Sequence, residues 1–528
     1  MKNKLLCYSL LAAVIGLGSC KKFLQENPKS EQPVSAYFQT IDQVQSAVNY
    51  LYNVAEGPNS LFNVGGLYDG TYSFLFDNLS GLANNLVAQN PSIPYFASLT
   101  FTAENANGYL DPLWAQLYSN IASANTIITN TTSNTAISST DAAPLLATAR
   151  YFRAMDYYYL VRIFGAVPLV LQPYTSLNNL DVTRTSIDSV YSAIESDLNW
   201  AITNGSLADK PMGGNGNQVS KGTAETLLAE VYLTAAGYPL QQGQAAYTQA
   251  LATATAVLNS TGGYALFDNS GGTTPFDKLR LTSYDGGSEY MYFVEYNSAI
   301  QQSAYPEYSI PNTFPLPIPN SPVQVAYTLM EQVWTPSTVL LGMYDSVNDI
   351  RRHEKQFFSS SFNYNSTATG LPVSIPYNVF MPYRWYDSVA IFQTAASGKY
   401  TAVYRLADVY LIAAEAANAL GQDPTPYLTP ILNRAYVTPP AIPADQAGRM
   451  TLILAERYRE LAMEGHFWFD MVRTRLYPDV TTPGTVTFSS LVGHSNGRGR
   501  SFTSTELLLP VPPTEIQRDP NLTQNAGY

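Results

Sequence analysis

The sequence predicts a mostly α-helical protein with a second, irregular part that contains minor β structure. Two observations lead to this prediction. Apolar residues recur at helical spacing over long stretches of the chain, as the buried face of a helix requires. Two other stretches, residues 61–102 and 262–400, lack this period, are interrupted by Gly and Pro, and are rich in aromatic residues. We therefore expect a helical scaffold with irregular, aromatic-rich insertions.

Neighbouring helices are expected to pack as antiparallel pairs with small residues on their contact faces. Each pair buries its apolar face only by stacking on the next, which is the principle of tetratricopeptide-like repeats. A strand is expected at Ser288–Glu295, where the side chains alternate. The expected helices are 41–56, 110–130, 141–164, 186–203, 223–236, 244–259, 405–420, 426–436 and 445–473.

Composition and charge exclude several functions. The net charge of -12 argues against nucleic-acid binding, which needs a basic surface. The three histidines are far apart and form no zinc motif, and Asp268, Asp277 and Asp285 lack the spacing of a calcium loop. We therefore expect no metal and no cofactor. The only cysteines are Cys7 and Cys20, so no disulfide is expected.

The N-terminus predicts export. Lys2 and Lys4 precede an apolar run from Leu5 to Leu17, which is too short for a membrane span and typical of a signal peptide over residues 1–19. Leu17-Gly18-Ser19-Cys20 resembles the lipobox of bacterial lipoproteins, in which the cysteine carries lipid. Residues 20–40 then form a lipidated tether. The alternative is an ordinary signal peptide that happens to end in Cys.

A dense charged motif lies between Glu456 and Arg473, in the last long helical segment. Glu460 and Glu464 could be interpreted as the acid and base of a glycosidase. Two carboxylates four residues apart on one helix cannot flank a sugar from both sides, as that chemistry needs. A salt-bridge network with Arg457, Arg459 and Arg473 is the favoured interpretation.

The motif Glu-Arg-x-Arg-Glu-Leu followed by Glu-Gly-His-x-x-x-Asp-x-x-Arg resembles the C-terminal motif of the SusD/RagB family of outer-membrane nutrient-binding lipoproteins. Together with the lipobox at Cys20, other marks of this family cover the chain from end to end. They are Trp114–Asn125, Arg150–Pro168, Arg405–Asn418, Leu509–Ile516 and Asp519–Tyr528.

This resemblance implies about four tetratricopeptide-like helix pairs and an irregular second subdomain built from long insertions. The protein would be a non-catalytic, surface-exposed lipoprotein of the outer membrane. It would capture oligosaccharides and deliver them to a SusC-like TonB-dependent transporter, on which the helical repeats would dock. A peptide ligand, as in the RagB-like branch, is the alternative. A secreted glycosidase and a lid that binds no ligand are further hypotheses.

The expected organisation has three parts after the tether. Residues 41–260 form the scaffold with its insertion 61–102, residues 261–400 form the ligand-binding subdomain, and residues 401–528 carry the C-terminal repeats. Sugars stack on aromatic rings, so the ligand is expected at the two insertions. Packing between subdomains is the alternative for each ring. The predicted ligand-binding residues are Tyr68, Tyr95, Phe96, Tyr305, Tyr308 and Trp334.

Overall fold

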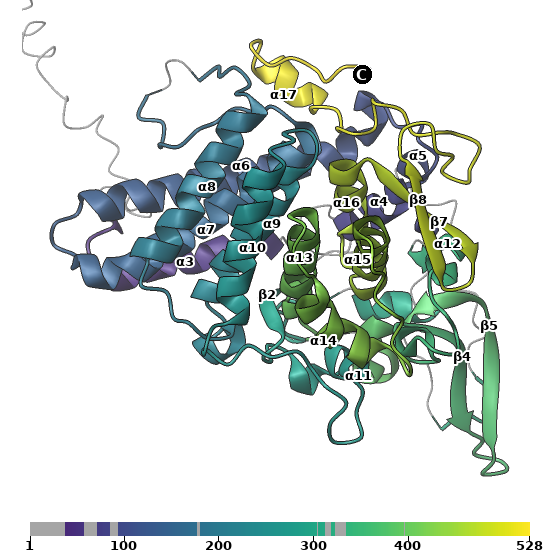
Figure 1. Cartoon of the computed structure of the whole chain (residues 1–528). Helices are drawn as coiled ribbons and strands as arrows, with labels where there is room; N and C mark the ends of the chain where they lie inside the picture. The colour runs from purple at the N-terminus through teal and green to yellow at the C-terminus, as the bar shows by residue number, and fades with distance from the viewer. Residues whose placement is uncertain are drawn as a thin grey trace, which may run out of the picture.

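The computed structural model describes residues 37–56, 71–84, 93–176, 180–303, 305–311, 318–322, 334–394 and 396–528. Residues 1–19, the expected signal peptide, and Cys20 lie outside these residues, and so does Tyr68. Figure 1 shows a bank of long helices beside a smaller region of short helices, hairpins and loops. Among the described residues, no helix has both the length and the apolar content needed to cross a membrane.

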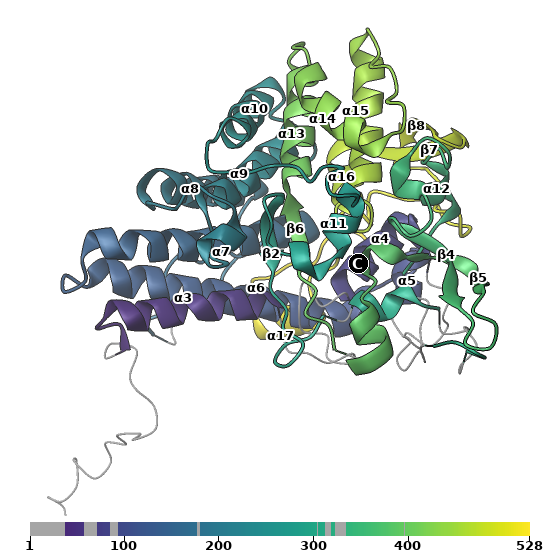
Figure 2. The ribbon, with the colours of Figure 1, turned by 90° about the horizontal axis from the view of Figure 1, so that it is seen from below.

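The scaffold is a series of helices in which each packs on the next. α3 lies along α6, as Figure 2 shows, and the series then continues through α7, α8, α9, α10 and α13 to α14 and α15. This agrees with the predicted stacking of helix pairs. The scaffold helices are α3 (Ile41–Glu56), α6 (Ala103–Ser133), α7 (Ser139–Phe164), α8 (Ile187–Asn204), α9 (Lys221–Ala236), α10 (Gln244–Leu258), α13 (Leu406–Ala419), α14 (Thr425–Ala435) and α15 (Gln446–Glu460).

Local sequence sets the ends of these helices. Thr102 and Asn105 form a capping box at the start of α6, where the Thr102 hydroxyl accepts from the Asn105 backbone N–H. Ser220 caps α9 in the same way through the Thr223 N–H. α7 ends at Gly165, whose φ of 75° favours glycine.

The prediction of one helix over residues 445–473 is wrong. The structure has two helices instead, α15 and α16 (Phe467–Thr474). Met463 and Gly465 between them have positive φ angles of 59° and 83°, which an α-helix does not allow. The chain turns at this break, so side chains of α15 and α16 can contact each other in the core, as Arg457 and Asp470 do.

The irregular region consists of short elements and pairs of strands. The predicted strand is β2 (Tyr290–Val294), which pairs antiparallel with β6 (Thr401–Arg405) in the interior. β4 (Phe358–Asn365) and β5 (Pro372–Pro382) form a hairpin that projects from the molecule in Figure 1.

The remaining elements of this region and of the C-terminus are short. They are α4 (Thr71–Ser80), α5 (Ile93–Ala97), α11 (Pro275–Arg280), α12 (Thr338–Gly342), α17 (Pro513–Arg518), β1 (Ala83–Asn84), β3 (Thr335–Pro336), β7 (Leu476–Thr482) and β8 (Thr485–Ser490).

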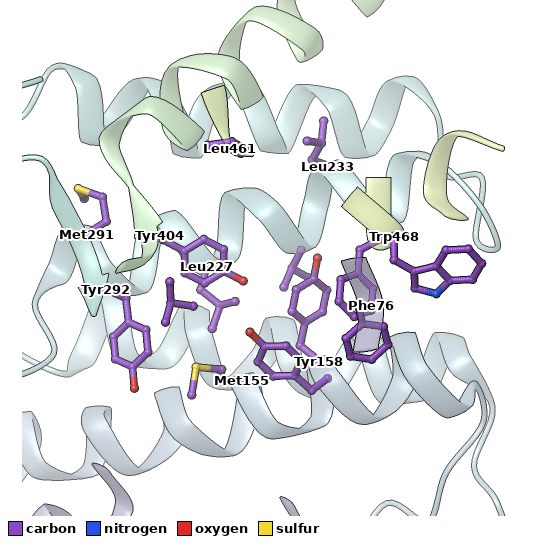
Figure 3. Close-up of a cluster of buried hydrophobic side chains, with 14 of the residues drawn as sticks. Phe76, Met155, Tyr158, Leu227, Leu233, Met291, Tyr292, Tyr404, Leu461 and Trp468 are labelled. Atoms are coloured by element: carbon purple, nitrogen blue, oxygen red, sulfur yellow. The ribbon is translucent and has the colours of Figure 1, made fainter. Parts of the chain in front are cut away.

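One large hydrophobic core joins the scaffold to the irregular region. Figure 3 shows Met155 and Tyr158 of α7 beneath Leu227 of α9, with Tyr404 of β6 and Trp468 of α16 on either side. The Tyr158 hydroxyl lies 2.6 Å from the Thr234 hydroxyl, so its polar end is satisfied. Burying each such side chain contributes roughly 1.5–3 kcal/mol to folding.

A buried ion-pair network lies at the boundary between the two regions, and Glu460 is at its centre. Arg434 Nη2 and Arg405 Nη1 donate to Glu460 Oε1 at 2.7 and 3.0 Å, and Arg351 Nη1 donates to Oε2 at 3.2 Å. Burial alone would raise the pKa of Glu460, but these arginines outweigh burial and lower the pKa to about 2. Glu460 is therefore ionised and surrounded by charge in the interior.

Other carboxylates complete the network. Glu289 binds Arg405 and Arg434 at 2.7 Å each, Glu456 binds Arg459 at 2.6 Å, and Glu464 binds both Arg405 and Arg384. The charged motif does form salt bridges, but the predicted partners of Glu460 and Glu464 are wrong. Arg457 and Arg473 pair with Asp470, and Arg459 pairs with Glu456. Glu460 and Glu464 are instead bound by arginines from other segments. Both Glu460 and Glu464 are engaged by arginines and buried, so this pair is not available as a glycosidase acid and base.

Two further buried ion-pair groups connect helices of the scaffold. Arg473 donates to both oxygens of Glu415 at 2.5 and 2.8 Å, which joins α16 to α13. Arg153 Nε donates to Asp197 at 2.7 Å, and Arg150 donates to the same carboxylate, which joins α7 to α8. Arg150, Arg153, Glu415 and Arg473 all lie in family-like segments, so these parts of the resemblance correspond to contacts between helices.

Replacing Glu460 with glutamine is expected to lower the free energy of unfolding by about 3–5 kcal/mol, because Arg405, Arg434 and Arg351 would keep their buried charge without this partner. Urea unfolding followed by circular dichroism measures the change. Glu515→Gln is the matched control, since it removes the partner of the exposed Arg518 and should cost less than about 1 kcal/mol. Equal effects of the two substitutions would contradict this account of the network.

Candidate functional site

The two aromatic-rich insertions meet in space. β1 of the first insertion pairs antiparallel with β3 of the second, with Ala83 opposite Pro336. The Ser337 N–H extends the pairing by donating to the Leu82 carbonyl at 2.8 Å. Segments about 250 residues apart therefore form one structural unit, and a ligand surface there could draw on both.

The junction is sealed by a cluster of three buried rings. Tyr305 stacks on Trp385 with a centroid distance of 4.6 Å, and Trp334 lies 5.5 Å from Tyr305. The Trp334 indole N–H donates to Asp77 Oδ2 of α4 at 2.8 Å. The cluster ties α4 of the first insertion to the second insertion.

The predicted ligand-binding residues occupy different environments. Phe96 is fully buried and stacks on Phe101 at 4.8 Å, and Tyr305 and Trp334 are each only 1% exposed. In this structure the rings of these three residues are covered by packing, which is the alternative weighed for them from the sequence. Tyr95 is 41% exposed. Tyr68 and the Tyr308 side chain lie outside what the structure describes.

A pair of half-buried tyrosines that was not among the predicted ligand-binding residues forms the most evident aromatic face in this region. Tyr383 and Tyr386 lie at a 3₁₀ turn that follows β5, and the Tyr386 N–H donates to the Tyr383 carbonyl at 2.9 Å. Side chains three residues apart eclipse one another in a 3₁₀ turn. The two rings accordingly stack, with a centroid distance of 4.6 Å and an interplanar angle of 16°.

The two residues between these tyrosines anchor the turn from inside. Arg384 is buried and forms an ion pair with Glu464, and its guanidinium lies 4.9 Å from the Phe357 ring centroid. Trp385 is buried in the cluster with Tyr305. The turn therefore places one pair of side chains in the core and leaves the other pair, Tyr383 and Tyr386, half-exposed.

The tyrosine pair has polar groups available at its rim. Neither phenol hydroxyl has a hydrogen-bond partner among the described residues. Burial raises the pKa of Tyr383 and the nearby Arg280 opposes this, so the phenol keeps its proton at neutral pH. The Arg280 guanidinium lies 5.1 Å from the Tyr383 ring centroid and is held by Asp277 at 2.7 Å. We call Tyr383, Tyr386 and Arg280 the tyrosine face.

The sequence contained one signal for the tyrosine face. Two tyrosines with Tyr-x-x-Tyr spacing directly follow Pro382, at the end of a segment rich in β-branched and aromatic residues. This spacing is compatible with an α-helix, a 3₁₀ turn or an irregular loop. The rings stack because the backbone forms a 3₁₀ turn here, which the sequence alone does not specify.

One group of described residues has the composition of a metal site. Asp408, Glu464 and His466 offer ligand atoms that lie within 4.8 Å of one another. Glu464 already binds Arg405 and Arg384, and Asp408 Oδ2 accepts from the Arg405 N–H at 2.8 Å. Because arginines already supply the positive charge here, the donor set does not fit a cation, and we assign no metal to it.

Comparison with known proteins identifies the family. Residues 338–528 match the SusD family, and residues 22–233 match a family described as starch-binding and associating with the outer membrane. The chain belongs to the SusD/RagB family. The two matches cover most of the scaffold and the C-terminal charged motif, as the sequence resemblance predicted.

Individual relatives agree along the whole chain. SusD-like protein P25 from Formosa agariphila is 24% identical over 536 residues, covering 97% of each chain. A crystal structure of a SusD superfamily protein from Parabacteroides distasonis is 28% identical, with a TM-score of 0.79, and covers 92% of this chain and 99% of that one. A laminarin-binding SusD-like protein is 23% identical, with a TM-score of 0.69 and coverage of 92% and 99%. The predicted fold class, a mostly helical protein with minor β structure, is confirmed.

The buried carboxyl of Asp77 predicts a pH effect at the aromatic junction. Burial raises the pKa of Asp77 to about 7, although the hydrogen bond from Trp334 lowers it. The folded state then holds a proton that the unfolded state releases above about pH 4. Stability should therefore fall as pH rises from about 4 to 7.

Asp77→Asn should remove this pH dependence of stability, because the amide does not titrate. The amide oxygen can still accept the hydrogen bond from Trp334. Urea unfolding of both proteins at pH 5 and pH 8, followed by tryptophan fluorescence, tests it. We expect the wild-type protein to lose more stability than D77N over this interval. Parallel losses in the two proteins would show that Asp77 does not titrate in this way.

Proposed function

We propose that this SusD-family protein binds oligosaccharides and that the tyrosine face is part of its binding surface. The observation that supports this most directly is the stacked Tyr383–Tyr386 pair, half-exposed on a turn that is anchored in the core. Sugar rings present C–H faces to aromatic rings and hydroxyls to polar groups. The phenol hydroxyls and Arg280 supply polar groups beside the two rings.

Relatives support a carbohydrate ligand. A structural neighbour of this chain is a laminarin-binding SusD-like protein, and another is a surface glycan-binding protein from Bacteroides uniformis. Starch-binding is part of the description of the family that residues 22–233 match. We infer that a neutral glucan is the class of ligand to test first.

The wider role follows from the family and from the N-terminus. We propose that Cys20 is lipidated, that residues 20–40 tether the protein to the outer membrane, and that it passes its ligand to a SusC-like TonB-dependent transporter without catalysis. We also propose that residues 41–260 form the scaffold, residues 261–400 the ligand-binding subdomain and residues 401–528 the C-terminal part. Of the residues predicted from the sequence, Tyr95 is the described one whose exposure suits direct ligand contact.

Tyr383→Ala and Tyr386→Ala are each expected to weaken oligosaccharide binding about tenfold, because each removes a stacking surface worth roughly 1.4 kcal/mol. Calorimetry with laminari-oligosaccharides and malto-oligosaccharides measures the affinity. Tyr386→Phe keeps the ring and removes only the hydroxyl, so it should lose less than Y386A.

Tyr174→Ala is the matched control, because Tyr174 is 53% exposed and lines a hollow beside α6 and α17 that contains no residue of the tyrosine face. It should leave the affinity unchanged. Binding that survives Y383A and Y386A would refute the tyrosine face as the site. Binding of peptides with no response to any glycan would instead favour the RagB-like alternative.

A further inference from the structure

A small apolar pocket lies among the scaffold helices and shares no residue with the tyrosine face. It has a volume of about 290 Å³ and is bounded by α7, α8, α16, the segment after α9, and residues 504–508. Most of its wall is apolar, including Val161, Ile187, Phe469 and Leu508. Its volume is at the lower end of the range for small-molecule sites, so the pocket suits one compact chemical group rather than several linked sugar or amino-acid residues.

The charges that line this pocket are all positive. Among the described residues, Arg162, Arg473 and Arg475 contribute to the wall, and no Asp or Glu does. The chain as a whole contains 40 acidic and 28 basic residues. The charge of the pocket wall is therefore opposite in sign to the net charge of the protein.

Arg473 is not free to bind a ligand, but Arg162 is. Arg473 forms ion pairs with Glu415 and Asp470. The Arg162 guanidinium is held between two rings, 3.7 Å from the centroid of Tyr158 and 4.1 Å from that of Phe469. Its Nε donates to the Tyr158 carbonyl at 3.2 Å, and among the described residues no carboxylate lies within ion-pair distance. The rings hold the guanidinium in place, and its two terminal nitrogens have no acceptor among the described residues.

Arg475 supplies a second guanidinium without an acidic partner. Its guanidinium carbon lies 4.8 Å from the centroid of the Tyr238 ring, and its Nη1 donates to the Val472 carbonyl at 2.8 Å. No carboxylate among the described residues pairs with it. Tyr238 is 40% exposed, so this side of the pocket reaches the solvent.

We propose that this pocket binds a carboxylate carried on a compact body with apolar faces. A planar guanidinium recognises a carboxylate through two parallel hydrogen bonds, and the apolar wall would cover the body of the ligand. Two sources have this chemistry, namely a uronic acid residue of a glycan and the C-terminal residue of a peptide. The inference does not depend on glycan binding at the tyrosine face.

Binding of matched charged and neutral probes to the purified full-length protein tests this proposal. The pairs are glucuronate with glucose, and N-acetylleucine with N-acetylleucine amide, measured by calorimetry or by ligand-observed NMR. We expect at least one carboxylate to bind saturably and its neutral partner to bind at least tenfold more weakly. Whichever carboxylate binds more tightly identifies the source.

Arg162→Gln and Arg475→Gln should each weaken the carboxylate at least tenfold. Arg518→Gln is the control, because Arg518 is exposed and outside the pocket, and it should change nothing. R475Q carries the test if R162Q, whose side chain packs between rings, proves unstable. Equal affinity for charged and neutral probes, or unchanged carboxylate binding in R475Q, would overturn the proposal. Laminari-oligosaccharide binding is measured in R475Q as well. Because the pocket and the tyrosine face share no residue, this affinity should not change, and the two proposals can fail independently.

Discussion

The buried ion pairs around Glu460 constrain the rest of the structure. Ionised groups in the interior are tolerated only when every partner is in place, because each loses its hydration. The partners here come from segments that are distant in the chain, since Glu289 precedes β2, Arg434 lies in the last turn of α14 and Arg351 belongs to the irregular region. The network can therefore be complete in only one arrangement of scaffold and insertion. Our hypothesis is that it selects this arrangement more than it adds net stability.

The same network determines what the surface can present. Glu464 holds Arg384, and Arg384 belongs to the turn that carries Tyr383 and Tyr386. A turn with one residue anchored by charge and the next buried among rings has little freedom to reorganise. A ligand that stacks on the two tyrosines would then meet a surface already in its binding geometry, which lowers the entropic cost of binding.

Sequence and structure agree where a pattern is local and diverge where the answer depends on distant segments. The helical period predicts α7 and α13 closely. It also continues across Gly465, and so it predicts a helix at a position where the structure has a turn. The charged motif predicted salt bridges, yet its partners Arg351 and Arg434 could not be found by spacing. Aromatic composition indicated where rings gather and could not tell the buried Trp334 from the half-exposed Tyr386.

The ion pairs also explain why an unpaired arginine is informative in this protein. Arginines of the interior, such as Arg405, Arg434 and Arg473, each bind at least one carboxylate. Because the chain has 40 acidic and only 28 basic residues, an acidic partner for a buried guanidinium is not in short supply. Arg162 is instead held between two rings at the wall of a pocket that no acidic residue lines. Stacking keeps its charge fixed in place, so a carboxylate that enters the pocket would meet a preoriented donor that forms no ion pair among the described residues.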